Sequence, residues 1–347
     1  MSAIATRVIQ VRTSPHVHSP RSVDTIMRNV VYALLPLCAW GVWLFGWSAL
    51  CLLITTTGTC ILAEHLYCRF TRRESSVNDY SVAITGILLG LILPPGLPLW
   101  MGALGSLIAV LPGKMIFGGL GHNVFNPALV GRVFLQSAFP VAISTYYPAM
   151  AGYRFSEIIP TSLAWPLMKA PPDAFSGATP LAQAKFDHVI TDPWTMFLGL
   201  RAGSIGETCV PLIFLCGLYL IIRGFMDWRI PTAMFSGAVA MGAVFHLLAP
   251  KAYPPPVFVL FAGGLMLGAM FMATDPVASP VTPRGMWIYG VLMGFITVLI
   301  RFLGGLAEGV MYAILLGNAL APLIDHLTQP RTYGERKKSK VLAGVSK

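Results

Sequence analysis

Ten stretches of the chain are apolar over roughly the length that crosses a lipid bilayer. They cover residues 29–47, 48–68, 80–96, 98–117, 124–146, 207–224, 230–249, 256–274, 286–303 and 305–325. A membrane-spanning helix needs about 20 predominantly apolar residues, and the glycines and prolines inside these stretches are tolerated in membrane helices. The pattern therefore predicts an all-α polytopic membrane protein with about ten transmembrane helices.

Polar residues gather in three segments around these stretches. Residues 1–28 form a basic N-terminal arm, residues 147–206 a long loop, and residues 326–347 a basic tail. The loop is too short and too poor in apolar residues to build a large core of its own. The chain is thus divided into two predicted membrane domains of five helices each, residues 29–146 and 207–325.

The two membrane domains contain an internal repeat. In the first copy Trp100 precedes an apolar run, Lys114 and a Gly-Gly-Leu triplet; in the second copy Trp287 precedes an apolar run, Arg301 and the same triplet. Because each half has an odd number of helices, the two copies must cross the membrane in opposite directions. Inverted repeats typically build a site near the midplane at their interface. The alternative is that paired glycines and interfacial tryptophans recur in any membrane protein.

Composition supports the membrane assignment. Of 347 residues, 55% are hydrophobic and 11% are charged, whereas soluble domains carry about 25% charged residues. The first 28 residues have no apolar core, so no cleaved signal peptide is expected before the first helix. The six cysteines lie in or beside apolar stretches without any C-x-x-C pair. We therefore expect neither a metal site nor an iron–sulfur centre held by this chain alone.

The placement of lysine and arginine predicts the orientation. With the N-terminal arm on the cytoplasmic side, that side receives 17 of the 24 basic residues and the opposite side receives five. Cytoplasmic loops of membrane proteins carry the excess of lysine and arginine. Both termini are therefore predicted to be cytoplasmic and the loop 147–206 to lie outside. The net charge of +10 is accounted for by this topology, and no nucleic-acid partner is expected.

A small-residue motif in the outer loop offers a reactive hydroxyl. Ser176, Gly177 and Ala178 precede Thr179, so that few side chains obstruct the threonine. The same string recurs inside an apolar stretch with Val239 in place of the threonine, and this copy lacks the hydroxyl. A transferase can bend such a loop into its own active site. The alternative is an ordinary small-residue turn.

Two asparagines enter the fifth apolar stretch. Asn123 and Asn126 are three residues apart and share one face if they are helical. Their carboxamides present donors and acceptors together, which suits the pyrimidine edge of an isoalloxazine ring. The alternative is a helix N-cap combined with a hydrogen bond between helices.

Ionisable residues inside membrane stretches are costly and are therefore functional candidates. Asp275 follows an apolar stretch and precedes a proline, and Glu308 follows the glycine pair of the second repeat. We interpret both as candidates for an ion pathway. The sequence contains no Walker lysine loop, no His-Glu-x-x-His motif and no recognisable Ser–His–Asp arrangement, so no catalytic residue is assigned.

Together these motifs closely resemble a known family. They are Ser176-Gly-Ala-Thr179, Gly203-Ser-Ile-Gly-Glu-Thr208, Gly121-His-Asn-Val-Phe-Asn-Pro-Ala-Leu129, Leu93-Pro-Pro95 and Met272-Ala-Thr-Asp-Pro276. The resemblance is to the D subunits of the Rnf complex, a bacterial ion-translocating ferredoxin:NAD oxidoreductase. It covers residues 14 to 325, and the related B subunits of the sodium-pumping NADH:quinone oxidoreductase carry similar motifs.

The resemblance implies a flavoprotein of the bacterial inner membrane. In the family, the threonine matching Thr179 carries FMN through a phosphoester bond, installed by a periplasmic flavin transferase that uses FAD. A second, non-covalent flavin, riboflavin, is associated with the membrane domain, and Asn123 and Asn126 match the positions that we assign to it. The family fold resembles ammonium and urea channels. The expected partners are the other Rnf subunits, including a second covalent-flavin subunit, and the chain is not expected to be active alone.

Three other functions remain open at this stage. The quinone-reductase subunit would imply a quinone as electron acceptor. A solute channel or transporter with the same inverted repeat would have no redox role, but it would have no need of a flavin tether at Thr179. A structural membrane scaffold would leave the placement of Thr179 unexplained.

Overall fold

A computed structural model describes residues 22–72, 77–166, 177–187, 189, 191–250 and 252–330. Over these residues the regular structure is helical, and extended pairing is limited to an isolated antiparallel bridge between Tyr146 and Gly177. Most of the N-terminal arm, most of the C-terminal tail and Ser176 of the small-residue motif lie outside the described residues.

The described residues of the first half fold into eight elements. They are α1 (Val23–Phe45), α2 (Trp47–Phe70), η1 (Val77–Asp79), α3 (Ser81–Ile92), α4 (Leu99–Val110), η2 (Leu111–Met115), α5 (Pro127–Ala138) and α6 (Pro140–Ser144). α1 begins where Ser22 Oγ accepts a hydrogen bond from Thr25 N at 3.2 Å, an N-cap. It ends at Gly46, whose φ of +72° turns the chain directly into α2. A Cβ at Gly46 would lie 1.8 Å from Arg154 O, so the turn requires glycine.

The outer loop and the second half supply the remaining elements. Those of the loop are η3 (Pro160–Leu163), α7 (Pro180–Ala182), η4 (Gln183–Asp187) and α8 (Pro193–Leu198). Those of the second half are α9 (Val210–Ile222), α10 (Arg229–Leu248), α11 (Pro256–Phe261), α12 (Leu265–Leu267), η5 (Gly268–Met272), α13 (Pro283–Leu303) and α14 (Val310–Thr328).

Helix forms in each of the ten predicted stretches, but the lengths differ. Among the described residues, five helices are long and apolar enough to cross a membrane: α1, α2, α10, α13 and α14. α3, α9 and the continuous helix Leu99–Met115 are shorter. α5 ends at Ala138 although its apolar stretch continues to residue 146, and the stretch 256–274 is divided into α11, α12 and η5. At 1.5 Å per residue, the 12 residues of α3 extend only about 18 Å.

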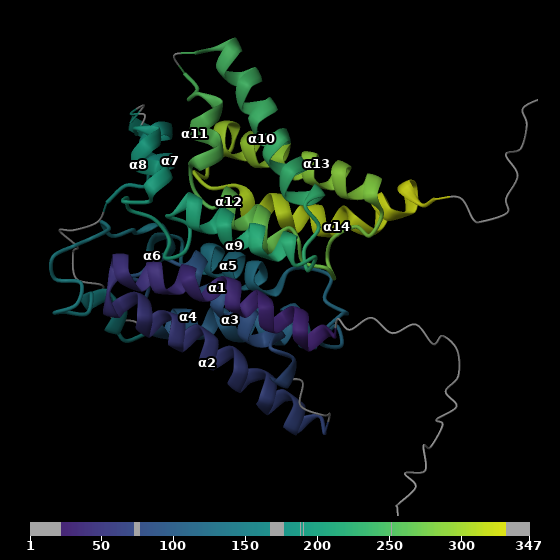
Figure 1. Cartoon of the computed structure of the whole chain (residues 1–347). Coiled ribbons are helices and arrows are strands. Elements are labelled where there is room, and N and C mark those ends of the chain that lie inside the picture. Colours follow the sequence, from purple (N-terminus) through teal and green to yellow (C-terminus); the bar gives the residue numbers. More distant parts are fainter. Residues whose placement is uncertain are drawn as a thin grey trace, which may run out of the picture.

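The two halves pack in the same order. α2 contacts α3 and α4, and α4 contacts α5; in the second half, α10 contacts α11 and α13, and α13 contacts α14. The halves meet where α1 contacts α9 and where α5 contacts α14. In Figure 1 the purple and blue helices of the first half lie below the green and yellow helices of the second, with α5, α9 and α12 between them.

The corresponding cations of the internal repeat each bind a carboxylate of their own half. In the first half, Lys114 Nζ donates to Glu64 Oε2 and to Ser81 Oγ, each at 2.7 Å. In the second half, Arg301 Nη2 donates to Glu308 Oε1 at 3.0 Å and to a backbone carbonyl between α11 and α12. Each cation thus joins a carboxylate to the third apolar stretch of its own half, near the start of α3 in the first half and of α12 in the second.

A left-handed residue lies near the start of both α3 and α12. α3 directly follows Tyr80, whose φ is +62°, and α12 begins two residues after Gly263, whose φ is +61°. A left-handed backbone is uncommon in a residue other than glycine. A short helix comes first in both copies, η1 before α3 and α11 before α12. Half-helices of this kind are typical of repeat-built membrane proteins that bind ligands inside the bilayer.

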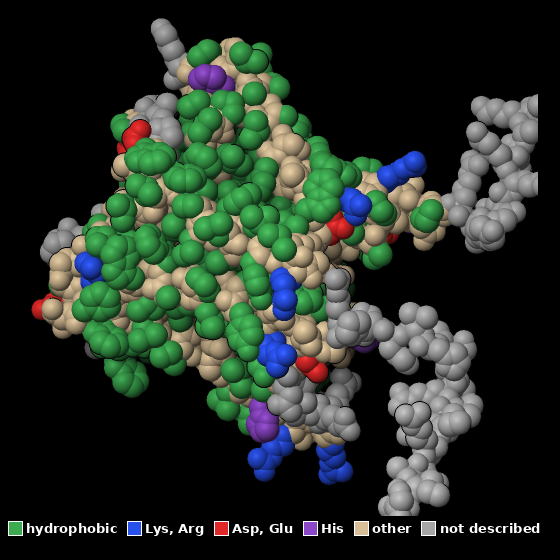
Figure 2. All heavy atoms as spheres, viewed as in Figure 1, with side chains coloured by type: hydrophobic (Ala, Val, Ile, Leu, Met, Phe, Trp, Pro, Cys, Tyr) green, Lys and Arg blue, Asp and Glu red, His purple; other side chains and the backbone are tan. Residues whose placement is uncertain are grey.

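The surface carries the apolar side chains that a bilayer would cover. Figure 2 shows hydrophobic side chains over most of the visible face, with most of its lysines and arginines gathered toward the side on which α1 begins and α14 ends. Close helix contacts depend on small residues, as is usual between membrane helices. A Cβ at Gly294 of α13 would lie 2.2 Å from Met234 O of α10.

Candidate functional site

Thr179 lies at the start of α7 on the wall of a large cavity. Its Oγ1 accepts a hydrogen bond from Ala182 N at 3.2 Å, and Pro180 occupies the first helical position. This is the N-cap arrangement, in which Ser and Thr are favoured and proline follows without losing a hydrogen bond. Thr179 is half-buried, Gly177 is half-buried and Ala178 is exposed. The motif therefore places the hydroxyl at a cavity rather than on an open surface.

The segment that carries Thr179 is attached to both halves of the protein. On one side, Gly177 N donates to Tyr146 O at 2.8 Å, just beyond α6. On the other side, Leu181 packs with Phe258 and Ala262 of the second half. Thr179 therefore lies at the interface between the two repeats.

Lys185 fixes the far end of this segment. Its Nζ donates to Arg301 O and Leu306 O, both at 2.8 Å, and to Gly304 O at the C-terminal end of α13. Burial lowers the pKa of Lys185, while the three carbonyl acceptors and the negative end of the helix favour its charged form. All three N–H donors of the ammonium group are thus satisfied by the protein.

Substitution Lys185→Met is expected to loosen the segment 177–187. A hydrogen bond from a charged group contributes about 1.5–3 kcal/mol, and partial exposure of Lys185 favours the lower end, so protection of these amides from deuterium exchange should fall roughly tenfold. Lys185→Arg, which keeps a cation, should retain most of the protection, and peptides from α10 should not change. Unchanged exchange over 177–187 in Lys185→Met would show that these bonds do not hold the segment.

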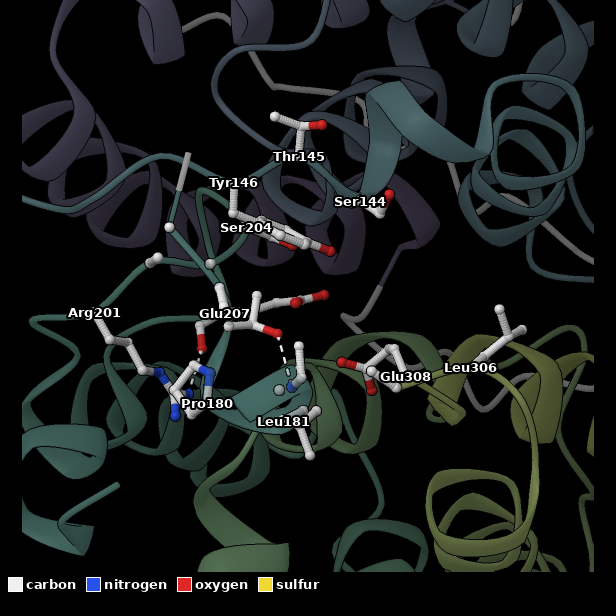
Figure 3. A pocket seen from close by; sticks show the side chains of 18 of the residues that line it. Ser144, Thr145, Tyr146, Pro180, Leu181, Arg201, Ser204, Glu207, Leu306 and Glu308 are labelled. Carbon is white, nitrogen blue, oxygen red and sulfur yellow. Dashed lines mark hydrogen bonds between the residues drawn. The ribbon is translucent and has the colours of Figure 1, made fainter. Parts of the chain in front are cut away.

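The cavity beside Thr179 has a volume of about 620 Å³. Its lining comes from the end of α5 and α6, the segment around Thr179, residues 201–207 before α9, Gly263 before α12, and residues 305–311 at the start of α14. Figure 3 shows that Thr145, Tyr146 and Ser204 lie on one side, and Pro180, Leu181 and Glu308 on the other. Pockets of 300–1,000 Å³ hold drug-sized ligands, so this cavity has room for a flavin.

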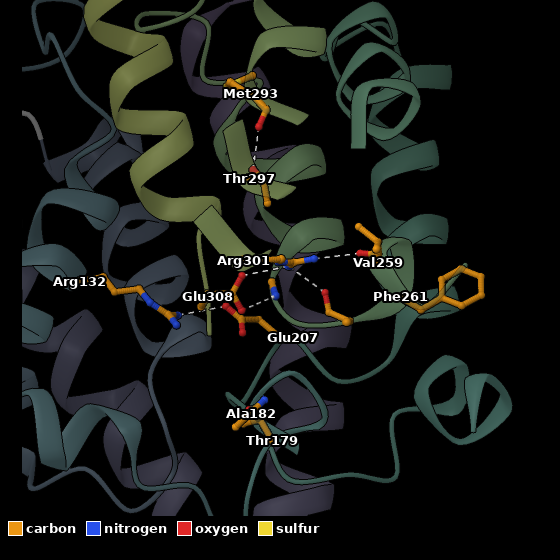
Figure 4. Close-up of polar contacts among 12 residues, drawn as sticks. Arg132, Thr179, Ala182, Glu207, Val259, Phe261, Met293, Thr297, Arg301 and Glu308 are labelled. Atoms are coloured by element: carbon orange, nitrogen blue, oxygen red, sulfur yellow. Dashed lines mark hydrogen bonds and ion pairs between the residues drawn. The ribbon is translucent and has the colours of Figure 1, made fainter. Parts of the chain in front are cut away.

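Two ion pairs, one buried and one partly buried, support the wall of this cavity. Arg132 Nη1 of α5 donates to Glu207 Oε1 at 3.0 Å, and Arg301 Nη2 donates to Glu308 Oε1 at 3.0 Å. Arg132 Nη1 also donates to Ile92 O, so that this guanidinium ties α5 to the end of α3. The two pairs lie next to each other (Figure 4). Since Glu207 and Glu308 line the cavity, both of its carboxylates are already paired with cations.

Paired glycines allow these carboxylates to approach the backbone. A Cβ at Gly263 would lie 2.3 Å from Glu308 Oε2, and one at Gly264 would lie 2.6 Å from Glu207 Oε1. Gly264 N donates to Glu308 Oε2 at 3.2 Å. The break between α11 and α12 thus provides an N–H donor, and its glycines leave space for the two carboxylates. A continuous helix with larger side chains would provide neither the donor nor the space.

Arg201 is a third cation on this wall, and no described ion pair involves it. Its Nη2 donates to Phe261 O at 2.9 Å and to Glu207 O at 3.4 Å, while its Nη1 is buried without a hydrogen-bond partner. The residue is 9% exposed. Burial lowers the pKa of Arg201 to about 10, which leaves the guanidinium charged at neutral pH.

A second, smaller cavity of about 110 Å³ contains the two asparagines and Asp275. Asn123 Nδ2 donates to Phe125 O at 3.1 Å and to Asp275 Oδ2 at 3.4 Å. Asn126 Oδ1 accepts from Ala128 N at 3.1 Å, and its Nδ2 donates to Met272 O at 3.3 Å. Asn126 is therefore the N-cap of α5 and bonds to the second half, as the alternative interpretation predicts, while the flavin assignment stays a prediction.

The two cavities lie at opposite ends of the bundle. The small one is lined near the starts of α1, α3 and α5, and the large one near the starts of α9, α12 and α14. The corresponding helices of the two halves thus begin at opposite ends of the bundle, which is the arrangement that inverted repeats produce. α9 runs from the large cavity to the small one, over about 20 Å for its 13 residues. Asp275 and Glu308, the two ion-pathway candidates, are thus far apart, one at each cavity.

Several charged residues in and around the large cavity cannot be assigned a role from the sequence. Arg201 and Lys185 stand alone in the outer loop, outside any motif that fixes their role. Arg132, Glu207 and Arg301 could be noticed as charges at or inside apolar stretches, but their pairing depends on the fold. Over the described residues no group of three His, Cys, Asp or Glu side chains could hold a metal ion.

Comparison with known proteins gives a consistent family. The model of the NQR2, RnfD, RnfE family matches residues 10–334. The chain is 38% identical to the D subunit of the ion-translocating oxidoreductase complex of Halorhodospira halophila, over 93% of this chain and 95% of that protein. It is also 38% identical to the D subunits of two ferredoxin:NAD(+) oxidoreductase complexes. One is the proton-translocating complex of Clostridium ljungdahlii, with 96% and 98% coverage, and the other is the Na(+)-translocating complex of Acetobacterium woodii, with 96% and 97%.

Proposed function

The chain belongs to the NQR2, RnfD, RnfE family, and we propose that it is the membrane-embedded D subunit of an Rnf-type ion-translocating ferredoxin:NAD⁺ oxidoreductase. The observation that carries this proposal is the near full-length similarity to proteins named as the D subunits of such complexes. The chain acts as one subunit of the translocase, together with other membrane and peripheral subunits that include a second covalent-flavin subunit. It has no oxidoreductase activity alone.

FMN is attached to Thr179 through its phosphate. A periplasmic flavin transferase supplies it from FAD: the threonine oxygen forms a bond to the FMN phosphorus, AMP leaves, and the hydroxyl proton is lost. The half-buried hydroxyl at the wall of a cavity of about 620 Å³ supports this assignment, because the site has both an attachment point and space. When bound, the isoalloxazine accepts and donates one or two electrons, while the protein sets its position and potential.

A non-covalent riboflavin binds near Asn123 and Asn126. Support comes from their shared position at the interface of the two halves, beside Asp275. The space of about 110 Å³ is smaller than a flavin needs, so Phe225 and Met226 on its wall must move, or a partner subunit must complete the site. Purified Thr179→Ala protein should still release riboflavin on denaturation, and Asn123→Ala should reduce the amount. Undiminished riboflavin in Asn123→Ala would contradict the assignment.

The protein lies in the bacterial inner membrane with both termini cytoplasmic and the Thr179 segment periplasmic. The gathering of basic side chains toward the side on which α1 begins and α14 ends supports this orientation (Figure 2). Flavins at opposite ends of the bundle would move electrons across part of the bilayer. One charge crossing the membrane potential exchanges about 2.3 kcal/mol per 100 mV, so electron flow and ion movement can be coupled, with Asp275 and Glu308 as candidate ion ligands.

The function is tested with the purified complex that contains this chain. We expect reduced ferredoxin to reduce NAD⁺ and, in sealed vesicles, to build a gradient of Na⁺ or H⁺. Turnover that requires quinone and not ferredoxin would favour the sodium-pumping NADH:quinone oxidoreductase instead. A colourless protein that moves a solute without electron flow would favour a channel. The similar relatives include one named for protons and one named for Na⁺, both at 38% identity, so the ion has to be measured.

A further inference from the structure

The charges around the Thr179 cavity do not balance. Three guanidinium groups, on Arg132, Arg201 and Arg301, stand against two carboxylates, on Glu207 and Glu308. Arg132 and Arg301 are each paired at 3.0 Å, and Arg201 makes no described ion pair. The wall therefore has one uncompensated positive charge, which suits an anionic ligand.

The geometry of Arg201 leaves donors available. Two backbone carbonyls hold Nη2 and so fix the plane of the guanidinium group. Nη1 carries two further N–H donors and is buried without an acceptor. Leaving donors of a charged group unpaired in a buried place costs more than leaving neutral donors unpaired. Nη1 is therefore available to donate to a ligand in the cavity.

The same cavity contains the place where a phosphate would be attached. A phosphodiester on Thr179 begins one bond beyond Oγ1, and Arg201 lines the same cavity as Thr179 (Figure 3). The other cation of this segment, Lys185, has all three donors bound to carbonyls. The two carboxylates of the wall would repel a phosphate if they were free, but each is paired with its arginine.

We propose that Arg201 binds the phosphate through which the flavin is attached to Thr179, as the residue that positions the tether. This inference rests on the proposed function, because it needs FMN at this site. The phosphate accepts the Nη1 hydrogen bonds that the protein leaves unmade, and the planar guanidinium group matches phosphate oxygens better than an ammonium group does. The flavin ring then extends from a fixed anchor into the rest of the cavity.

The test uses two free flavins that differ only in the phosphate. In the Thr179→Ala background no covalent bond can form, and binding of added FMN and of added riboflavin to protein whose Asn123 site already holds riboflavin is measured by quenching of flavin fluorescence. We expect FMN to bind about tenfold or more tightly than riboflavin, the preference that one charged hydrogen bond gives. Thr179→Ala/Arg201→Met should lose this preference while riboflavin binding is unchanged, and Arg201→Lys should retain part of it.

The matched control is Arg154→Met. Arg154 is another guanidinium on the outer side with a buried, unpaired Nε, but it does not line the cavity, so its removal should leave the FMN preference intact. An FMN preference that survives in Arg201→Met would overturn the inference. Equal weakening of both flavins would also overturn it, because Arg201 would then contact the ring.

Failure of the inference can be told from failure of the proposed function. Wild-type protein matured with the flavin transferase should carry covalent flavin, and Arg201→Met should carry less while eluting as a folded protein of the same size. Covalent flavin at the wild-type level in Arg201→Met would overturn the role of Arg201 alone. Absence of covalent flavin from the wild type would instead reject FMN at Thr179.

Discussion

Thr179→Ala is expected to abolish the proposed covalent flavin and, with it, electron transfer through the complex. The alanine side chain has no oxygen to form the phosphoester, so the expected loss is complete. Because the Thr179 hydroxyl also caps α7 by accepting from Ala182 N, a cost of about 1 kcal/mol is expected for this short helix. The measurement is in-gel flavin fluorescence of denatured protein after expression with an active flavin transferase.

The chain itself offers the control for this experiment. Residues 235–239 read Phe-Ser-Gly-Ala-Val, so Val239→Thr creates a second copy of the complete string. That copy lies inside α10, where the backbone is already hydrogen-bonded and cannot bend into an enzyme. Thr179→Ala/Val239→Thr should therefore stay dark, whereas Thr179→Ser should keep part of the fluorescence. Fluorescence in the double variant would mean that the string alone directs attachment; fluorescence in Thr179→Ala would place the flavin on another residue.

Breaking the buried pair between Arg132 and Glu207 should give the largest loss of stability. Arg132→Leu leaves the Glu207 carboxylate without its cation in a buried place, and loss of one partner of such a pair costs about 3–5 kcal/mol. The pair also joins α5 of the first half to the segment before α9 of the second. The free energy of unfolding in detergent is therefore expected to fall by this amount in Arg132→Leu.

The double variant Arg132→Leu/Glu207→Leu separates the contribution of the ion pair from the cost of leaving one buried charge unpaired. Replacing both partners removes the unpaired charge, so much of the stability should return. A second ion pair is the matched control: Arg229 and Asp227 lie 2.9 Å apart, but both side chains are about a third exposed. Arg229→Leu should cost less than about 1 kcal/mol. Equal costs for the two arginines would show that burial of the Arg132 pair adds nothing.

The apolar pattern predicts much of the fold, because membrane helices must satisfy their backbone polar groups internally. Helix forms in all ten stretches, and the repeat that matches Lys114 with Arg301 is supported because each cation binds a carboxylate of its own half. The break within 256–274 could not be read from the sequence. Gly263 and Gly264 look like any helix-packing glycines there, and only the approach of Glu207 and Glu308 shows why they interrupt the helix.

The sequence predicts a candidate site where a single residue stands out, and it does not predict the groups of residues that the fold brings together. Thr179 stands out by its small neighbours and its place in the outer loop, and the structure puts it at a cavity. Lys185 and Arg201 could not be found, because their roles depend on backbone carbonyls from residues 261 to 306, far away in the chain. The sequence allows two interpretations of Asn126, a flavin ligand and a helix N-cap. It could not decide between them because both use the same side-chain amide.

Part of the wall of the Thr179 cavity is made by residues 305–311, at the start of α14, the last helix of the described residues. During synthesis Thr179 leaves the ribosome more than a hundred residues before this wall exists. A nascent chain, or one truncated before α14, therefore has the attachment residue without the finished site. A ligand that needs the whole cavity can be retained only after α14 has been inserted. Its presence on the chain would therefore show that synthesis and insertion of the protein are complete.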